Sequence, residues 1–147
     1  QCIERAETIN PKHPMSTKAS ALRRTMLPRK TPPTEAIELN WRAYNCISDH
    51  KKCRELATEC TKRFPEFEYG FVTLGALEKD EGNTAAAEEC FRHALTINPD
   101  NVHAMSRLGD IVRWHNLREA KALWSRAVLL DPDDTFDGYM LELYKDK

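Results

Sequence analysis

The chain has 147 residues, of which 41% are apolar and 31% are charged, and its formal net charge is −1. This length and composition suit about one domain with a buried core. No apolar run approaches the roughly 18 residues of a membrane-spanning helix, and no signal peptide is visible, so we expect no association with a membrane.

The first third of the chain begins with two segments of different character, residues 1–11 and 12–33. Ile3, Ala6 and Pro11 have the spacing of the end of an amphipathic helix, so we expect the chain to start inside a second helix whose partner lies upstream. Residues 12–33 contain six Lys or Arg residues, four prolines and no acid, which gives +6 against −7 elsewhere. We interpret this range as a basic, proline-containing insertion or linker.

The range 34–67 predicts two helices, although its pattern is the most divergent of the three units in the chain. Trp41 stands where the next two units have glycine. A side chain of this size at a helix crossing either pushes the helices apart or turns outward, so we expect an irregular crossing. The residues at the repeating positions are Ile37, Trp41, Tyr44, Cys53, Ala57, Cys60 and Pro65.

The range 68–101 has the clearest pattern, because apolar residues recur every three or four positions on both sides of Gly82 and Asn83. This spacing predicts two amphipathic helices joined by a tight turn, and Pro99 ends the second one. A strand over 69–77 is disfavoured because the alternation fails from Ala76 onward. The repeating residues are Phe71, Leu74, Gly75, Ala87, Phe91, Ala94 and Pro99.

The range 102–134 repeats this pattern, and the range 135–147 does not. Gly109 and Ala120 lie one residue closer than Gly75 and Ala87, so the first helix should end about one residue early. The repeating residues are Met105, Leu108, Gly109, Ala120, Trp124, Ala127 and Pro132. After Pro132, apolar residues with helical spacing predict one last helix that covers the final unit; they are Phe136, Tyr139, Met140, Leu143 and Tyr144.

This order of aromatic, Leu-Gly, Ala, Phe, Ala and Pro residues resembles the tetratricopeptide repeat (TPR), a unit of about 34 residues. Glu78, where that family usually has Tyr or Leu, is the clearest departure. The resemblance implies an all-α fold, a right-handed α-solenoid of helix-turn-helix repeats. It would comprise the second helix of a truncated repeat, the basic insertion, three repeats and a capping helix, at 1–11, 12–33, 34–67, 68–101, 102–134 and 135–147.

The resemblance also implies a function, since the concave face of such a solenoid binds other proteins. We expect a non-catalytic scaffold that holds a protein, peptide or helix in this groove, as a segment of a larger protein within a multiprotein assembly. The groove positions of the family correspond to Glu35, Glu38, Arg42 and Asn45 in the first repeat, Tyr69, Val72, Ala76 and Lys79 in the second, and His103, Ser106, Asp110 and Arg113 in the third.

One well-known use of the family is a clamp for the C-terminal carboxylate of chaperones that end in Glu-Glu-Val-Asp. That clamp uses Lys and Asn in the first repeat, Asn in the second, and Lys and Arg in the third. Only Arg107 agrees with these residue types, and the charge of Glu38 is repulsive, so we predict that the clamp is absent. The corresponding positions are Glu38, Arg42, Thr73, His103 and Arg107.

The sequence contains no arrangement typical of an enzyme, a metal site or a cofactor site, because phosphate-binding glycine loops, HExxH and GxSxG are missing. The five cysteines form no zinc-ligand spacing. We expect Cys53 and Cys60 to be small buried side chains. The odd number of unpaired thiols favours a reducing compartment, the cytoplasm, with cytoskeletal, ciliary or nuclear placement as alternatives.

The basic segment leaves three interpretations open: a solvated linker, an arm that binds nucleic acid, tubulin tails or an acidic protein, and a strap on the acidic surface of this chain. Its main cations are Arg23, Arg24, Arg29 and Lys30. Nucleic acid is the weaker partner because the segment lacks the interleaved aromatic residues of a single-strand binder. An anion-binding module is the alternative function.

Overall fold

The structure, a computed structural model, describes residues 31–46, 49–133 and 135–147, and all regular structure in these ranges is helical. The predicted all-α solenoid is confirmed. The predicted half repeat at 1–11, and the basic segment except for Thr31, Pro32 and Pro33, lie outside the described residues. The helices are α3 (Thr34–Asn45), α4 (His50–Arg63), α5 (Glu68–Asp80), α6 (Thr84–Ile97), α7 (Val102–Val112), α8 (Leu117–Leu130) and α9 (Thr135–Leu143).

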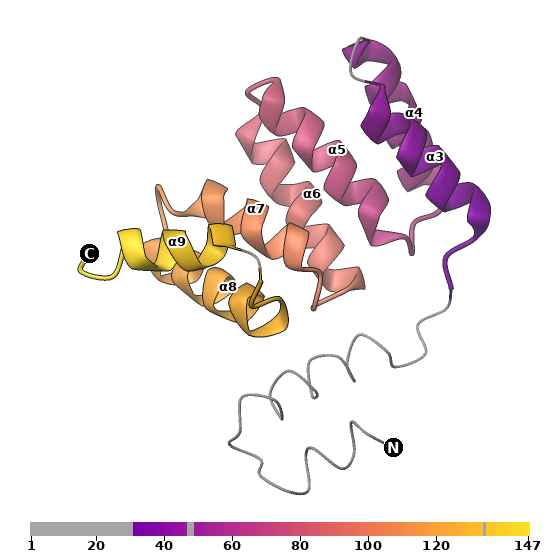
Figure 1. Cartoon of the computed structure of the whole chain (residues 1–147). Helices are drawn as coiled ribbons and strands as arrows, with labels where there is room; N and C mark the ends of the chain where they lie inside the picture. Colours follow the sequence, from indigo (N-terminus) through magenta and orange to yellow (C-terminus); the bar gives the residue numbers. More distant parts are fainter. Residues whose placement is uncertain (1–30, 47–48, 134) are drawn as a thin grey trace, which may run out of the picture.

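The helices are arranged as successive hairpins, α3/α4, α5/α6 and α7/α8, and α9 packs on α8 at the C-terminal end (Figure 1). Each hairpin contacts the next through its second helix. The first helices α3, α5 and α7 also lie against one another, whereas the second helices are farther apart. The face formed by the first helices is therefore the concave one; we call it the first-helix face.

The helix crossings in the second and third hairpins depend on a glycine opposite a large aromatic ring. A Cβ atom at Gly75 would lie 2.9 Å from Cε1 of Phe91, and one at Gly109 would overlap the indole of Trp124. Phe91 and Trp124 are completely buried in one continuous apolar core. The small residue lets the two backbones approach, and the ring fills the remaining volume.

The turns and helix starts follow from local hydrogen bonds. Gly82 has a φ of 83°, which glycine adopts without steric cost, and it closes the turn between α5 and α6. The side chains of Asp49, Asn101 and Asn116 accept hydrogen bonds from the backbone N–H three residues later. The third hairpin has a shorter first helix than the second, because α7 ends at Val112 and a four-residue turn follows.

The buried residues of helix α3 are not those at the repeat positions that the sequence suggested. Its buried residues are Ala36, Leu39 and Ala43, whereas Ile37, Trp41 and Tyr44 are exposed. The repeat positions that the sequence assigned to this helix are therefore not its buried positions. Relative to the repeat alignment, helix α3 is rotated about its own axis by one residue position, and its small side chains therefore face α4. There, Sγ of Cys60 lies 3.8 Å from the carbonyl oxygen of Ala36. Of the two outcomes expected for Trp41, the structure shows the outward turn.

Three thiols lie within the hairpins. Cys53 and Cys60 are buried among the small residues of α4, which confirms the prediction for both. Cys90 on α6 is half-buried beside the position of Gly75. Burial raises the pKa of all three thiols, to about 11 for Cys90, because the thiolate would lose its hydration.

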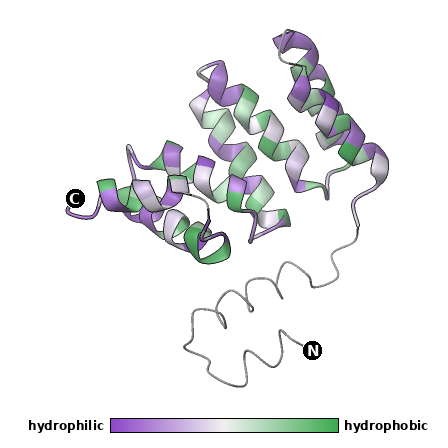
Figure 2. Ribbon diagram, in the orientation of Figure 1, coloured by the Kyte–Doolittle hydropathy of each residue, from purple (hydrophilic) through white to green (hydrophobic). Residues whose placement is uncertain are grey.

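The last helix closes the core at the C-terminal end. Met140 is buried in the main core, and the ring of Tyr144 stacks on the buried Trp124 with centroids 5.9 Å apart. Every helix carries hydrophobic and hydrophilic residues, as an amphipathic solenoid requires (Figure 2). Helix α9 therefore covers a surface of α8 that would otherwise expose Trp124.

Candidate functional site

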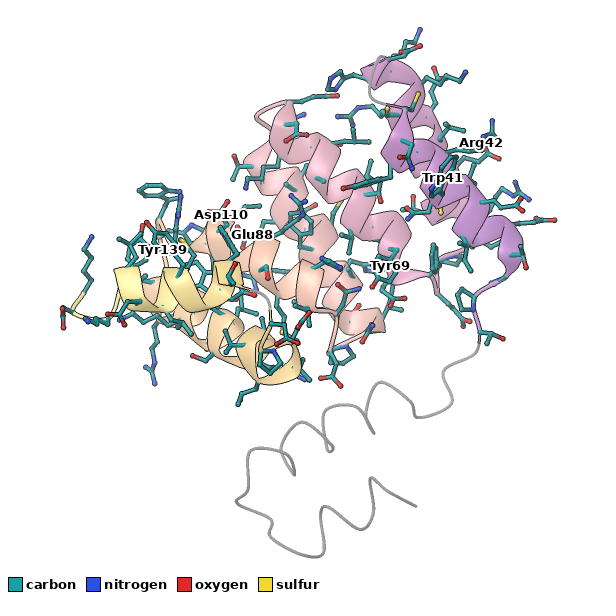
Figure 3. All side chains as sticks on the ribbon, in the orientation of Figure 1. Trp41, Arg42, Tyr69, Glu88, Asp110 and Tyr139 are labelled. Carbon is teal, nitrogen blue, oxygen red and sulfur yellow. The ribbon has the colours of Figure 1, made fainter. Side chains whose placement is uncertain are left out.

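The first-helix face is formed by side chains from α3, α5, α7 and α9, and Figure 3 labels one from each helix: Trp41, Tyr69, Asp110 and Tyr139. The repeat alignment pairs each residue of α3 with the residue of α5 that lies 34 positions later. Because α3 is rotated by one residue position, the residues of the two helices that share this face are 35 positions apart. The matching residues of α3 are Thr34, Ile37, Trp41 and Tyr44; those of α9 are Phe136, Tyr139 and Leu143.

The predicted groove residues of α3 therefore lie in different places. Glu35 pairs with Arg63 of α4, with Nη2 and Oε2 2.8 Å apart. Asn45 donates a hydrogen bond of 2.8 Å to the carbonyl oxygen of Trp41 in its own helix. Glu38 and Arg42 are exposed beside the row formed by Ile37 and Trp41. The sequence could not locate this row because both adjacent faces of α3 carry apolar residues.

The middle of the first-helix face is polar, and two cations there share one carboxylate. Lys79 of α5 forms an ion pair with Asp110 of α7, and Arg113 Nη1 lies 3.2 Å from the other oxygen of Asp110. Oγ of Ser106 donates a hydrogen bond of 2.5 Å to the buried Asp137 of α9. The predicted residues Lys79, Ser106, Asp110 and Arg113 thus serve first as links between neighbouring helices.

Two of the predicted residues are aromatic neighbours, and one is buried. The rings of Tyr69 and His103 lie 6.1 Å apart, which joins α5 to α7 at the start of both helices. Val72 belongs to the buried core and is 8% exposed, so it offers little surface to a partner. Ala76 is half-buried and lies between these residues and Lys79 along α5.

A small pocket of about 230 Å³ lies between α3, α4 and α5, and Arg107 of α7 also lines it. Tyr44, Ala76 and Arg107 line it on the first-helix face. Arg107 is exposed, and no ion pair within the described part of the chain involves it. It is therefore a cation available to a ligand beside an exposed aromatic ring.

Ion pairs also join successive hairpins elsewhere. Arg54 of α4 binds Glu78 and Glu81, and Arg92 of α6 binds Glu119 of α8 at 2.6 Å. The Arg54 guanidinium holds the pKa of Glu78 below its ordinary value, and a 2.9 Å hydrogen bond from Asn83 acts in the same direction. Glu78, the departure from the family pattern, thus couples the first two hairpins.

The described residues contain no group of three His, Cys, Asp or Glu side chains that could hold a metal ion, and none of their helices is long and apolar enough to cross a membrane. Two histidines on these helices pack against aromatic rings. His93 packs on Phe71, with ring centroids 4.2 Å apart, and His103 lies against Tyr69. Among the described residues, the exposed first-helix face is therefore the clearest candidate for a functional site.

Comparison with known proteins gives three kinds of similarity. Residues 70–101 match the family model described as tetratricopeptide repeat. Superkiller protein 3 of Schizosaccharomyces pombe is 35% identical over 81 residues, which is 54% of this chain and only 6% of the length of that protein. The chain thus corresponds to a small part of this curated relative.

Solved structures share the arrangement of the helices. The first TPR of Spaghetti (RPAP3) bound to the HSP90 peptide SRMEEVD has a TM-score of 0.67 at 18% identity, over 78% of this chain and 94% of that one. The Sgt2 TPR domain from Aspergillus fumigatus has a TM-score of 0.68 at 20% identity, over 81% of this chain and 83% of that one. The Hsp90 co-chaperone Cns1 from Saccharomyces cerevisiae has a TM-score of 0.63 at 25% identity, over 74% of this chain and 38% of that one.

Proposed function

Starting from a chain that carries a tetratricopeptide repeat at 70–101 and has the solenoid fold of TPR domains, we propose that it is a non-catalytic module that binds other polypeptides on its first-helix face. One observation carries the proposal. Side chains of α3, α5, α7 and α9 lie on the side where the first helices approach one another, whereas the core residues are enclosed between the hairpins. A surface of this kind suits an extended peptide or a helix.

The proposal excludes the carboxylate clamp, although the Spaghetti neighbour is bound to the peptide SRMEEVD. At the offsets of the two first-repeat clamp residues, the turned helix α3 places Ile37 and Trp41, which cannot bind a carboxylate by charge. Thr73, at the second-repeat position, is 6% exposed and therefore largely inaccessible. Arg107 is the one clamp position with the matching residue type.

The proposed function also includes the assembly and the compartment in which the module acts. We propose that it acts as a scaffold within a larger assembly, since solenoid segments commonly hold several partners. A reducing compartment such as the cytoplasm agrees with the free thiols of Cys46, Cys53, Cys60 and Cys90.

The test compares two surfaces of the same protein as baits for cell extract. One bait carries Tyr69→Ala and His103→Ala on the first-helix face, and the control carries Glu89→Ala on the exposed side of α6. We expect the proteins retained by the unchanged chain to be lost from the first bait and kept by the control, as measured by quantitative mass spectrometry. Equal retention by the two variants would place binding elsewhere and refute the proposal.

A further inference from the structure

Large apolar side chains are exposed mainly on the first-helix face. Nine large hydrophobic residues are exposed among the described residues, and seven of them occupy the matching offsets of α3, α5 and α9. Trp114 and Leu129 are the other two. Because single exposed apolar residues are ordinary but a shared face is not, this concentration indicates a binding surface. The seven are Ile37, Trp41, Tyr44, Tyr69, Phe136, Tyr139 and Leu143.

The strongest part of this surface is the row formed by Ile37, Trp41 and Tyr44, which are 50%, 65% and 66% exposed. These residues do not stabilise the hairpin, because α3 packs on α4 through Ala36, Leu39 and Ala43. Helix α3 thus has two apolar faces, one used in folding and one left to solvent. An amphipathic helix that only needed to fold would carry polar residues on the second face.

The charges near this row limit the chemistry of a partner. Lys79 and Arg113 share the carboxylate of Asp110 and are only 35% and 21% exposed, so they are less accessible to an acidic ligand than a fully exposed cation. Arg107 is exposed at the pocket that Tyr44 also lines. A partner with one carboxylate can therefore gain an ion pair there, whereas further carboxylates along the row would meet Glu38 as well as Arg42, both of which are exposed beside it.

We propose that the occupant of this surface is an amphipathic segment of another protein, with large aliphatic or aromatic side chains on Ile37, Trp41 and Tyr44 and one carboxylate on Arg107. This inference rests on the proposed function and specifies its ligand. The aromatic rings bury large apolar areas at little conformational cost, as in the energetically dominant residues of protein interfaces. The single ion pair fixes the direction of the segment along the face.

The experiment selects dodecapeptides from a random phage-displayed library on the full 147-residue chain and measures their affinities by fluorescence polarisation. We expect the selected peptides to carry at least two large apolar residues and one Asp or Glu. Trp41→Ala and Arg107→Gln should each weaken binding about tenfold. The control Leu129→Ala removes an apolar residue that is 57% exposed on the second helix α8, outside this surface, and should change binding less than about twofold.

A separate experiment tests the ion pair between Arg107 and the carboxylate of the ligand. Replacing the acid of the selected peptide by its amide should weaken binding to the unchanged chain about tenfold and have no further effect on the Arg107→Gln variant. The peptide SRMEEVD serves as an acid-rich comparison and should bind at least tenfold more weakly than the selected peptides. Circular dichroism of each variant checks that the fold is retained.

Three results would overturn the inference. Selected peptides that bind the Trp41→Ala variant unchanged, or tight binding of SRMEEVD, would refute this ligand while leaving the module a peptide binder. A dimer in sedimentation that Trp41→Ala converts to a monomer would show that a second copy occupies the surface. A selection that enriches no peptide, while Tyr69→Ala with His103→Ala retains all partners from extract, would refute the proposed function as well.

Discussion

At the scale of single residues, the two crossing glycines make the sharpest demands on the sequence. Gly109 faces the Trp124 indole and Gly75 faces the Phe91 ring, and in both places a methyl group would overlap the aromatic side chain. Gly138 in α9 has no atom within 4 Å of the position its Cβ would take. The same substitution therefore has opposite consequences at these sites.

We predict that Gly109→Ala lowers the free energy of unfolding by about 1–3 kcal/mol, because a packed ring must move. Gly138→Ala, the matched control, should leave stability unchanged or raise it by about 0.5–1 kcal/mol, because alanine favours the helix. Urea unfolding followed by circular dichroism measures both. Equal midpoints for the two variants would show that the crossing does not depend on the glycine.

The sequence was sufficient to find these glycines, because Leu-Gly and an aromatic residue recur at fixed distances in two successive units. It was not sufficient to explain Glu78. Its partner Arg54 lies in the preceding hairpin, and the contact exists only after the two hairpins have packed. A family pattern marks such a residue as a departure but cannot supply the partner that makes it stable.

At the scale of the element, α3 shows where periodicity alone is ambiguous. Residues Ala36, Leu39 and Ala43 form one apolar row, and Ile37, Trp41 and Tyr44 form the row beside it. Both have helical spacing, so the sequence allows two orientations that differ by one residue. The structure turns the small residues toward Cys53, Ala57 and Cys60 of α4, since bulky side chains at that crossing would separate the helices. As a result, the predicted groove positions of α3 move by one residue.

We predict that Ala43→Leu destabilises the chain by about 1–3 kcal/mol, because Ala43 is 1% exposed. Trp41→Gln should change stability by less than about 0.5 kcal/mol, because the indole projects into solvent. Thermal and urea unfolding of the two variants decide between the orientations. If Trp41 instead lay between α3 and α4, the other outcome that the sequence allowed, Trp41→Gln would be the more damaging substitution.

At the scale of the whole molecule, stability depends on how each hairpin is joined to the next. The concave side is linked by Lys79 with Asp110, and other links are Arg54 with Glu78 and Arg92 with Glu119. In a solenoid each repeat contacts only its neighbours, so weakening one link affects one interface and not the whole core. The Arg54–Glu78 link is the most informative because Glu78 is nearly buried.

We predict a pH dependence from this link. Arg54 holds the pKa of Glu78 below its ordinary value of 4.5, so the unfolded chain binds this proton more readily than the folded one. The stabilisation is fully present above pH 4.5 or so and is lost as the pH falls through the folded pKa. Glu78→Gln should therefore reduce stability at pH 7 by on the order of 1 kcal/mol, and the difference from the unchanged chain should shrink in acid.

Unfolding free energies measured between pH 7 and pH 3 test this expectation. Glu142→Gln is the control, since that side chain is 70% exposed and pairs only with the nearby Lys145 among the described residues. It should lie within about 0.5 kcal/mol of the unchanged chain at neutral pH. Parallel curves for Glu78→Gln and the unchanged chain would mean that Glu78 titrates equally in the folded and unfolded states.

The reaction rate of a buried thiol can be used to measure how often the first hairpin opens. Cys60 of α4 is completely buried against α3 and α5, whereas Cys46 is only half-buried in the turn between α3 and α4. A thiol-reactive dye can reach Cys60 only when α4 separates from these neighbouring helices, so the rate at which Cys60 is labelled reports such local openings. A ligand bound to Ile37, Trp41 and Tyr44 of α3 would slow the labelling of Cys60 without contacting its sulfur. Binding to the concave face would then be followed from the adjacent, buried face of the same helix, with no tag added to the protein.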